Sequence, residues 1–239
     1  TGWTFAGLDN YTRLVGDVDF WISLWNTAVI GALSLSAQFV IALGLSVMAY
    51  RDPWVSGWRI LFLLPMLFMP SAVSFIWKLA FNDGRVISDL LMRVWLIDQP
   101  LDFLGNVWLA RLSLIVTDVW QWTPFLFIIF TAALQGQDPE IEEAARLDGA
   151  NWLQIFWKVS LPLMRPVIAV ALILRGIDIV TMFASIFIIT GGTPGGATET
   201  ISYFIYRTGF KQFNFGYASA ASVLLLIATL YTFRAVARG

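Results

Sequence analysis

The sequence contains neither cysteine nor histidine. Their absence excludes thiol nucleophiles, Ser-His-Asp triads, histidine-ligated zinc and haem bound through histidine. No GxxxxGK[ST] phosphate-binding loop occurs either, so an energy-consuming cycle would need ATP to be hydrolysed by another chain. The chain is therefore predicted not to be an enzyme and to hold no metal or cofactor of its own.

Charged residues are also scarce, because they make up 13% of the chain against 58% for hydrophobic residues, and the mean hydropathy is +0.73. A soluble domain of 239 residues could not bury this much apolar surface. Four uncharged runs are long enough to cross a bilayer core of about 30 Å as helices. They cover residues 20–50, 60–77, 119–137 and 212–233. A fifth span is predicted over 167–190, although it contains Arg175 and Asp178.

Continuous apolar runs of this length are typical of helices and not of the alternating strands of an outer-membrane barrel. The predicted fold class is therefore all-α, a polytopic transmembrane helical bundle with five spans. Pro65, Pro70 and Pro124 fall inside these spans and are expected to bend or break their helices. Such bends either shape a path through the bundle or fit neighbouring helices.

A charged segment lies between the predicted spans 119–137 and 167–190. Here, over residues 138–162, the chain reads DPEIEEAARLDGANWLQIFWKVSLP. Asp138 is a helix N-cap residue, Pro139 suits the first helical position, and Gly149 can adopt a positive φ that ends a helix. The glutamates after Pro139 lie where the helix dipole favours anions. The segment therefore predicts a short helix over 139–147. Without further information it could be a helical hairpin on the protein's own surface.

This segment resembles the EAA loop of permease subunits in bacterial binding-protein-dependent ABC importers. The resemblance is carried by Glu143-Ala144-Ala145, by Gly149 after three residues, and by Val159 and Leu161-Pro162 further on. Only Val159 departs from it, since isoleucine is usual there. In that family the loop forms a coupling helix that docks into a cytoplasmic ATPase. By this resemblance the coupling residues are Glu143, Ala144, Ala145, Leu147, Asp148 and Gly149.

The resemblance covers nearly the whole chain and is strongest to the first permease of maltose-type carbohydrate importers. It rests on Trp120, Pro124-Phe125, Thr190-Gly191-Gly192, Thr198-Glu199-Thr200, Tyr206-Arg207 and Phe215-Gly216-Tyr217-Ala218. It implies a multi-pass protein of the bacterial inner membrane. The implied partners are a second homologous permease, a cytoplasmic ABC ATPase dimer that holds ATP and Mg²⁺, and an extracytoplasmic solute-binding protein, with no nucleic acid. Thr193 and Ala184 depart from the family pattern, so the substrate stays open.

Lysine and arginine residues divide equally between the two sets of loops, so the positive-inside rule gives no orientation. The family resemblance places residues 136–166 in the cytoplasm as the coupling loop. Residues 1–19 are then an extracytoplasmic segment that follows a missing first helix, and 20–239 form one permease domain, with six spans in the full protein. Phe81 to Arg111 is predicted to be an extracytoplasmic loop, which either is solvated or contacts a binding protein.

Arg175 and Asp178 are ionisable residues within a predicted span, and Asp118 directly precedes another. Charge inside the membrane is costly and normally faces a bundle interior or water. One interpretation is a buried network that holds helices together, since Arg175 and Asp178 are three residues apart on one helix. A second interpretation is a proton or ion relay in a self-sufficient carrier or channel. A third is a substrate site.

The family resemblance implies a substrate path over Gln121, Trp122, Phe125, Arg175, Asp178, Ile179 and Met182. Gln121, Arg175 and Asp178 can hydrogen-bond hydroxyl groups, while the rings of Trp122 and Phe125 offer faces to the CH groups of a sugar. This combination suits a neutral sugar or polyol. Arg175 could instead bind the phosphate of a glycerol phosphate, although Asp178 nearby argues against a dianion.

Overall fold

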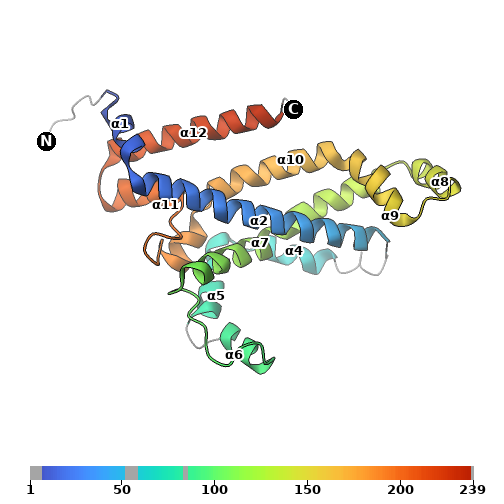
Figure 1. Cartoon of the computed structure of the whole chain (residues 1–239), viewed down its shortest axis with the longest axis horizontal. Coiled ribbons are helices and arrows are strands. Elements are labelled where there is room, and N and C mark those ends of the chain that lie inside the picture. The colour runs from blue at the N-terminus through green and yellow to red at the C-terminus, as the bar shows by residue number, and fades with distance from the viewer. Residues whose placement is uncertain (1–6, 52–58, 83–85, 238–239) are drawn as a thin grey trace. The chain divides into compact units, whose positions relative to one another are not determined.

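The computed structural model describes residues 7–51, 59–82 and 86–237, which contain helices and no strand. Figure 1 labels most of these helices, and their bounds follow here. They are α1 (Asp9–Gly16), α2 (Val18–Arg51), α4 (Arg59–Leu67), α5 (Pro70–Phe81), α6 (Val86–Arg93), α7 (Val107–Gln135), α8 (Pro139–Leu147), α9 (Trp152–Ile155), α10 (Leu161–Val180), α11 (Ile201–Tyr206) and α12 (Phe215–Ala237), with π-helical turns η1 (Phe156–Ser160), η2 (Ile186–Thr190) and η3 (Arg207–Lys211). Residues 1–6 of the predicted terminal segment lie outside the described residues.

Two described helices, Val18–Tyr50 within α2 and all of α7, are long and apolar enough to cross a membrane. The predicted span over 60–77 is not one straight helix. It consists of α4 and α5, which meet at an angle of 104°. Pro70 stands at the first position of α5, where its missing N–H costs nothing. The proline signal in the sequence therefore marks a sharp break.

The predicted span over 167–190 is also interrupted, because α10 ends at Val180 and η2 begins at Ile186. Two backbone carbonyls near this interruption accept side-chain bonds from a later segment. The Ser202 hydroxyl donates to Val180 O at 3.0 Å, and the Thr200 hydroxyl donates to Met182 O at 3.5 Å. These distant hydroxyls replace bonds that a continuous helix would make, and the local sequence does not reveal them.

α7 begins at Val107, twelve residues before the predicted span. Asn106 caps it, since its side-chain oxygen accepts from the N–H groups of Trp108 at 2.9 Å and Leu109 at 3.2 Å. The charged residues Arg111 and Asp118 are thereby included in the helix, and Asp118 is buried. The segment 81–111, predicted to be an extracytoplasmic loop, contains α6 and the start of α7.

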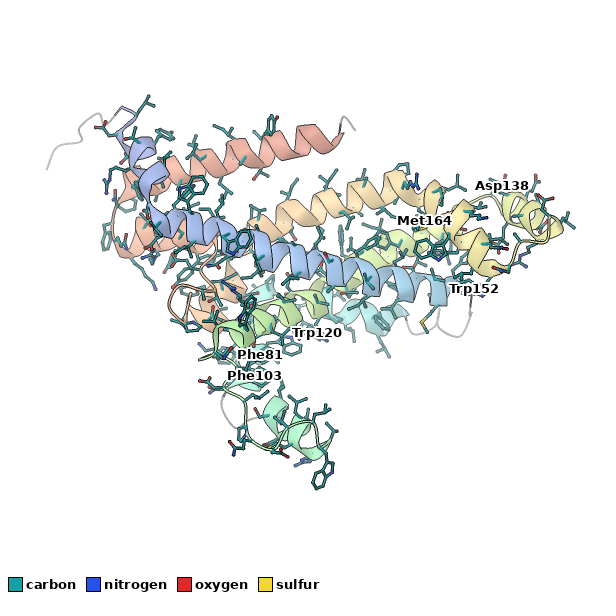
Figure 2. The ribbon with its side chains drawn as sticks, viewed as in Figure 1. Phe81, Phe103, Trp120, Asp138, Trp152 and Met164 are labelled. Carbon is teal, nitrogen blue, oxygen red and sulfur yellow. The ribbon has the colours of Figure 1, made fainter. Side chains whose placement is uncertain are left out.

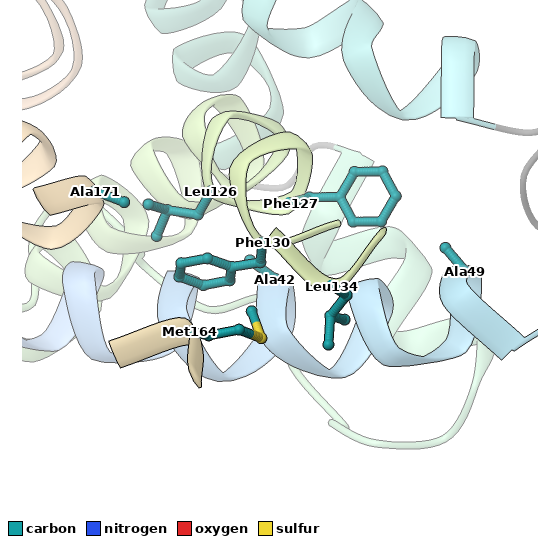
Figure 3. Close-up of a cluster of buried hydrophobic side chains, with 8 residues drawn as sticks. All are labelled: Ala42, Ala49, Leu126, Phe127, Phe130, Leu134, Met164 and Ala171. Atoms are coloured by element: carbon teal, nitrogen blue, oxygen red, sulfur yellow. The ribbon is translucent and has the colours of Figure 1, made fainter. Parts of the chain in front are cut away.

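The chain divides into two compact units. Unit 1 contains residues 1–33, 70–118 and 176–239, and unit 2 contains residues 34–69 and 119–175. The core of unit 2 is drawn in Figure 3, where Leu126, Phe130 and Leu134 project from α7 beside Ala42 and Met164. Alanines in this cluster let helix backbones approach closely, as is usual within membranes.

In unit 1, two side chains hold the glycine-rich turn that follows η2. The Asn26 side chain donates to Gly196 O at 2.9 Å and to Glu199 O at 3.1 Å. Arg111 donates to Ala197 O at 3.0 Å and to the Asn26 side-chain oxygen at 2.8 Å. The turn is therefore fixed by α2 and α7, which its glycine content alone would not indicate.

Candidate functional site

The predicted coupling helix is α8, and its bounds match the predicted 139–147. The Asp138 side chain accepts from the Glu140 N–H at 3.0 Å, as an N-cap does. At the other end Gly149 has φ 82°, and its N–H donates to Arg146 O at 3.0 Å. The Ala150 N–H donates to Ala145 O, also at 3.0 Å, which completes a Schellman motif. Local chemistry thus defines both ends of this helix.

No side chain of α8 is buried in the chain. The Leu147 side chain is 90% exposed, and Glu143, Ala144, Asp148 and Gly149 are exposed as well. Ala145 is half-buried. An apolar residue projecting this far from a charged helix is suited to a pocket on another protein. All six predicted coupling residues thus lie on one short segment, and five of them are exposed.

A residue that the sequence did not indicate holds α8 to the end of α2. The Tyr50 hydroxyl donates to one Glu142 carboxylate oxygen at 3.0 Å, and Arg146 donates to the other at 2.6 Å. Tyr50 is the last residue of an uncharged run, and this position was the available signal. The bond connects a membrane-spanning helix directly to the loop helix.

The second half of the loop is also held by hydrogen bonds. Asn151 and Gln154 form a capping box that starts α9, with both bonds at 2.9 Å. The Gln137 side chain donates to Ser160 O at 2.9 Å and connects the two ends of the loop. Figure 2 labels Asp138, which caps α8, and Trp152, the first residue of α9. The loop is a folded element with two capped helices.

Four of the predicted substrate-path residues lie in unit 2, and two of them are in contact there. The Arg175 Nε donates to the Gln38 side-chain oxygen at 3.0 Å, and its guanidinium carbon lies 5.0 Å from the centre of the Trp122 ring. Arg175 and Gln38 are buried. Gln38 was missed by sequence reasoning, and its signal was an amide side chain inside a long uncharged run. These contacts agree with a buried network.

Gln121 occupies a different position, at the break between α4 and α5. Its side-chain amide donates to Phe68 O at 3.1 Å, and Gln121 is only 2% exposed. A helix break leaves backbone groups without helical partners, so this bond stabilises the break. Phe125, one turn further along α7, is partly buried and packs against the core of unit 2.

The other three predicted path residues lie in unit 1, on and just beyond the last turn of α10. Asp178 is exposed and Ile179 is buried. A methyl group built on Gly31 would lie 2.8 Å from the Ile179 side chain, so a larger residue there would force Ile179 to move. Met182 packs against the cluster that contains Ile186 and Tyr203.

Unit 1 also contains a charged cluster near the glycine-rich turn. Arg207 donates to the Glu199 carboxylate at 2.8 Å and to the Asp19 carboxylate at 3.3 Å. Burial raises the pKa of the Glu199 carboxyl, and the attraction of Arg207 opposes this shift without cancelling it. The cluster connects the start of α2 to η3. These hydrogen bonds are sufficient to explain the three residues as a structural network.

Residues 40–237 match the family described as binding-protein-dependent transport system inner membrane component. The chain belongs to this family. A trehalose/maltose transport system permease protein of Thermococcus litoralis is 33% identical over 95% of this chain and 76% of its own length. A lactose transport system permease protein of Rhizobium radiobacter is 31% identical over 95% of this chain and 78% of its own length. The resemblance to carbohydrate permeases is confirmed.

The fold is also found in solved transporters. A bacterial alginate ABC transporter in complex with a pentasaccharide-bound periplasmic protein superposes with a TM-score of 0.83, over 96% of this chain and 81% of the other, at 24% identity. A methionine ABC transporter in inward-facing form gives a TM-score of 0.63 at 20% identity, over 90% of this chain and 92% of the other. The protein is thus an all-α membrane bundle of the ABC importer permease type.

Proposed function

We propose that this chain is one of two permease subunits of an ATP-driven importer, and that it passes a sugar or polyol into the cytoplasm by alternating access. The observation that carries the proposal is α8, a doubly capped helix between α7 and α10 in which most side chains are exposed and none is fully buried. The proposed partners are a homologous permease, a cytoplasmic ATPase dimer that binds ATP and Mg²⁺, and an extracytoplasmic solute-binding protein.

The proposed substrate class rests on the relatives. Their names refer to trehalose and maltose, to lactose and, in Agrobacterium fabrum, to sulfoquinovosyl glycerol. All of these are polyhydroxylated compounds, although the sulfonate group of sulfoquinovosyl glycerol is anionic, so a sugar or polyol is the class with the widest support. The alternative of a self-sufficient ion-coupled carrier leaves an exposed, capped helix between membrane helices without a purpose.

Cross-linking tests the coupling role of α8. The chain has no cysteine, so a single Leu147→Cys substitution provides one reactive thiol, and Glu140→Cys at the start of the same helix provides a matched control. We expect the thiol at 147 to cross-link to the ATPase in the assembled complex. The thiol at 140 should react less. Cross-linking of position 147 to the binding protein would reverse the proposed orientation.

The substrate path proposed over Gln121, Trp122, Phe125, Arg175, Asp178, Ile179 and Met182 needs a separate test. Asp178→Ala should reduce uptake while ATPase stimulation by the loaded binding protein continues, since an exposed carboxylate can bind a hydroxyl group of the substrate. A hydrogen bond to a charged group contributes about 1.5–3 kcal/mol, which corresponds to a reduction of about 10–150-fold. Unchanged uptake would remove Asp178 from the path.

Arg175→Ala distinguishes a path from a buried network. If Arg175 mainly stabilises the bundle through Gln38 and Trp122, its loss should lower the thermal midpoint of the purified complex. The Gln38→Ala/Arg175→Ala double variant should then recover part of that loss. Arg165→Ala, an exposed arginine on the same helix, is the control. If uptake falls and the midpoint does not change, Arg175 contacts the substrate.

A further inference from the structure

The segment that carries α6 is closed at its base by a pair of buried aromatic rings. The ring centres of Phe81, the last residue of α5, and Phe103 lie 5.4 Å apart, and Trp77 stacks on Phe81 at 5.2 Å. Figure 2 labels Phe81 and Phe103 beside each other. The α6 segment thus leaves and rejoins the protein at one place, next to the end of the bent pair formed by α4 and α5.

α6 carries an apolar stripe that faces away from the rest of the protein. The Ser88 hydroxyl, on the buried side, lies 3.4 Å from the Leu101 backbone nitrogen that donates to it. Val86, Leu90 and Val94 are spaced i, i+4 and i+8 and therefore form one stripe, and they are 57%, 55% and 59% exposed. The side toward the protein is apolar too, since Ile87, Leu91 and Met92 are partly buried there. A helix whose outer side faced only water would carry polar residues in place of the outer stripe.

The end of α6 presents a tryptophan in an unusual backbone conformation. Trp95 has φ 59°, and its side chain is 90% exposed. Its N–H donates to Met92 O at 3.1 Å, and the Leu96 N–H donates to Leu91 O at 3.0 Å, so α6 ends in a Schellman motif. Glycine normally occupies this left-handed position, which costs a larger residue about 1–2 kcal/mol. The Trp95 ring thus points away from the protein although its backbone conformation is unfavourable.

The charged residues of α6 lie beside the apolar stripe and not within it. Asp89 and Arg93 are both exposed and are one helical turn apart, on the edge next to Val86 and Leu90. An apolar stripe, a flanking charged edge and a terminal tryptophan are the features of helices that lie in a membrane interface. Tryptophan in particular is enriched at the level of the lipid headgroups.

The connection to α5 keeps α6 near the membrane. α5 ends at Phe81 and α6 begins at Val86, so five residue steps separate them. Even fully extended, five steps reach only about 17 Å. The apolar stripe of α6 therefore stays close to the end of α5, whether or not another protein is bound.

We propose that α6 is an interfacial helix, which inserts Val86, Leu90, Val94, Trp95 and Leu96 into the headgroup–acyl boundary on the face of the membrane where α7 begins. The partner is the lipid surface itself. This inference rests on the membrane location of the protein and not on the coupling role proposed for α8, so the two can fail separately.

Site-directed spin labelling tests this proposal in the assembled complex, reconstituted into lipid nanodiscs. The labelled variants are Leu90→Cys on the apolar stripe and Asp89→Cys on the charged edge, and the cysteine-free parent chain supplies the background from partner subunits. The measured quantity is the accessibility of the label to oxygen, which concentrates in lipid, relative to a water-soluble nickel chelate. We expect oxygen to dominate at position 90 and the nickel chelate at position 89.

Two results would overturn the proposal. If the label at position 90 is as accessible to the nickel chelate as the label at 89, the stripe faces water. If the label at 90 is shielded from both reagents only when loaded binding protein is added, the stripe is a protein-docking surface. Oxygen accessibility at position 90 that does not change when binding protein is added supports the lipid interface.

Discussion

Two short helices, α6 and α8, end in the same backbone motif and yet present opposite surfaces. At the end of α8 the left-handed position belongs to Gly149, which adopts φ 82° without steric cost. At the end of α6 the equivalent residue is Trp95, at φ 59°. α8 is charged and presents Leu147, whereas α6 presents an unbroken apolar stripe. The same way of ending a helix thus serves a helix suited to a protein partner and a helix suited to lipid.

The largest effect is expected from Glu143→Lys, which tests whether α8 needs its charge in order to dock. A like-charge contact at an interface costs several kcal/mol, so uptake should fall by about 100-fold or more. The thermal midpoint of the chain should change little, because surface substitutions alter stability by only about 0.5 kcal/mol. Uptake and coupled ATP hydrolysis in proteoliposomes measure this. Wild-type uptake would show that α8 does not couple.

The next effect separates backbone strain from packing at Gly149. No atom lies within 4 Å of a methyl group built there, so Gly149→Ala tests the positive φ alone. The cost should be about 1–2 kcal/mol, seen as about 5–30-fold faster hydrogen exchange of the Gly149 and Ala150 backbone amides. Gly176→Ala in α10 also meets no atom within 4 Å and is the control. Equal exchange in the two variants would mean that φ is irrelevant.

At Trp95 a change to glycine should stabilise the end of the helix, whereas the change from glycine at position 149 should destabilise it. Trp95→Gly removes the cost of the left-handed conformation, so the Leu96 amide should exchange about 5-fold more slowly than in Trp95→Ala, a difference of about 1 kcal/mol. Both variants lack the ring, and the comparison therefore isolates the backbone. If the Leu96 amide exchanges faster in Trp95→Gly, the ring and not the backbone determines how α6 ends.

The smallest effect is expected from Tyr50→Phe, which removes only the hydroxyl that bonds Glu142. An intramolecular hydrogen bond contributes about 0.5–1.5 kcal/mol, and less where water competes. A spin label at Ala145→Cys should become modestly more mobile, while coupled ATP hydrolysis falls by about twofold. Tyr231→Phe, at an exposed tyrosine of α12, is the control. No change in mobility would remove Tyr50 from the mechanism.

The sequence predicted best those features that depend on residues close together in the chain. The bounds of α8 were predicted because Asp138, Pro139 and Gly149 act on the backbone within a few residues of themselves. The predicted run 20–50 agrees closely with α2, since hydrophobic length alone defines a membrane-spanning helix. The start of α7 was missed because a rule based on uncharged runs stops at Asp118, a residue that the fold buries.

The interruptions and the buried network required the fold. The bend between α4 and α5 has a proline signal, but Gln121 stabilises it from 53 positions away in the chain. The gap after α10 has no breaker residue and depends on hydroxyls from Ser202 and Thr200. Gln38 and Arg175 are separated by 137 positions, so no local pattern pairs them. The roles assigned to the six coupling and seven path residues stay predictions.

By itself, the sequence determined that this protein is a helical membrane protein, that it has no histidine or cysteine chemistry, and that a capped helix lies between two membrane-spanning segments. These properties depend on composition, on run length and on residues adjacent in the chain. Only the tertiary structure decided where two predicted spans break, which polar groups satisfy one another, and which side of α6 faces away from the protein. The reason is physical, because a buried donor or helix face is satisfied by whatever group the fold brings to it, and that group can come from anywhere in the chain.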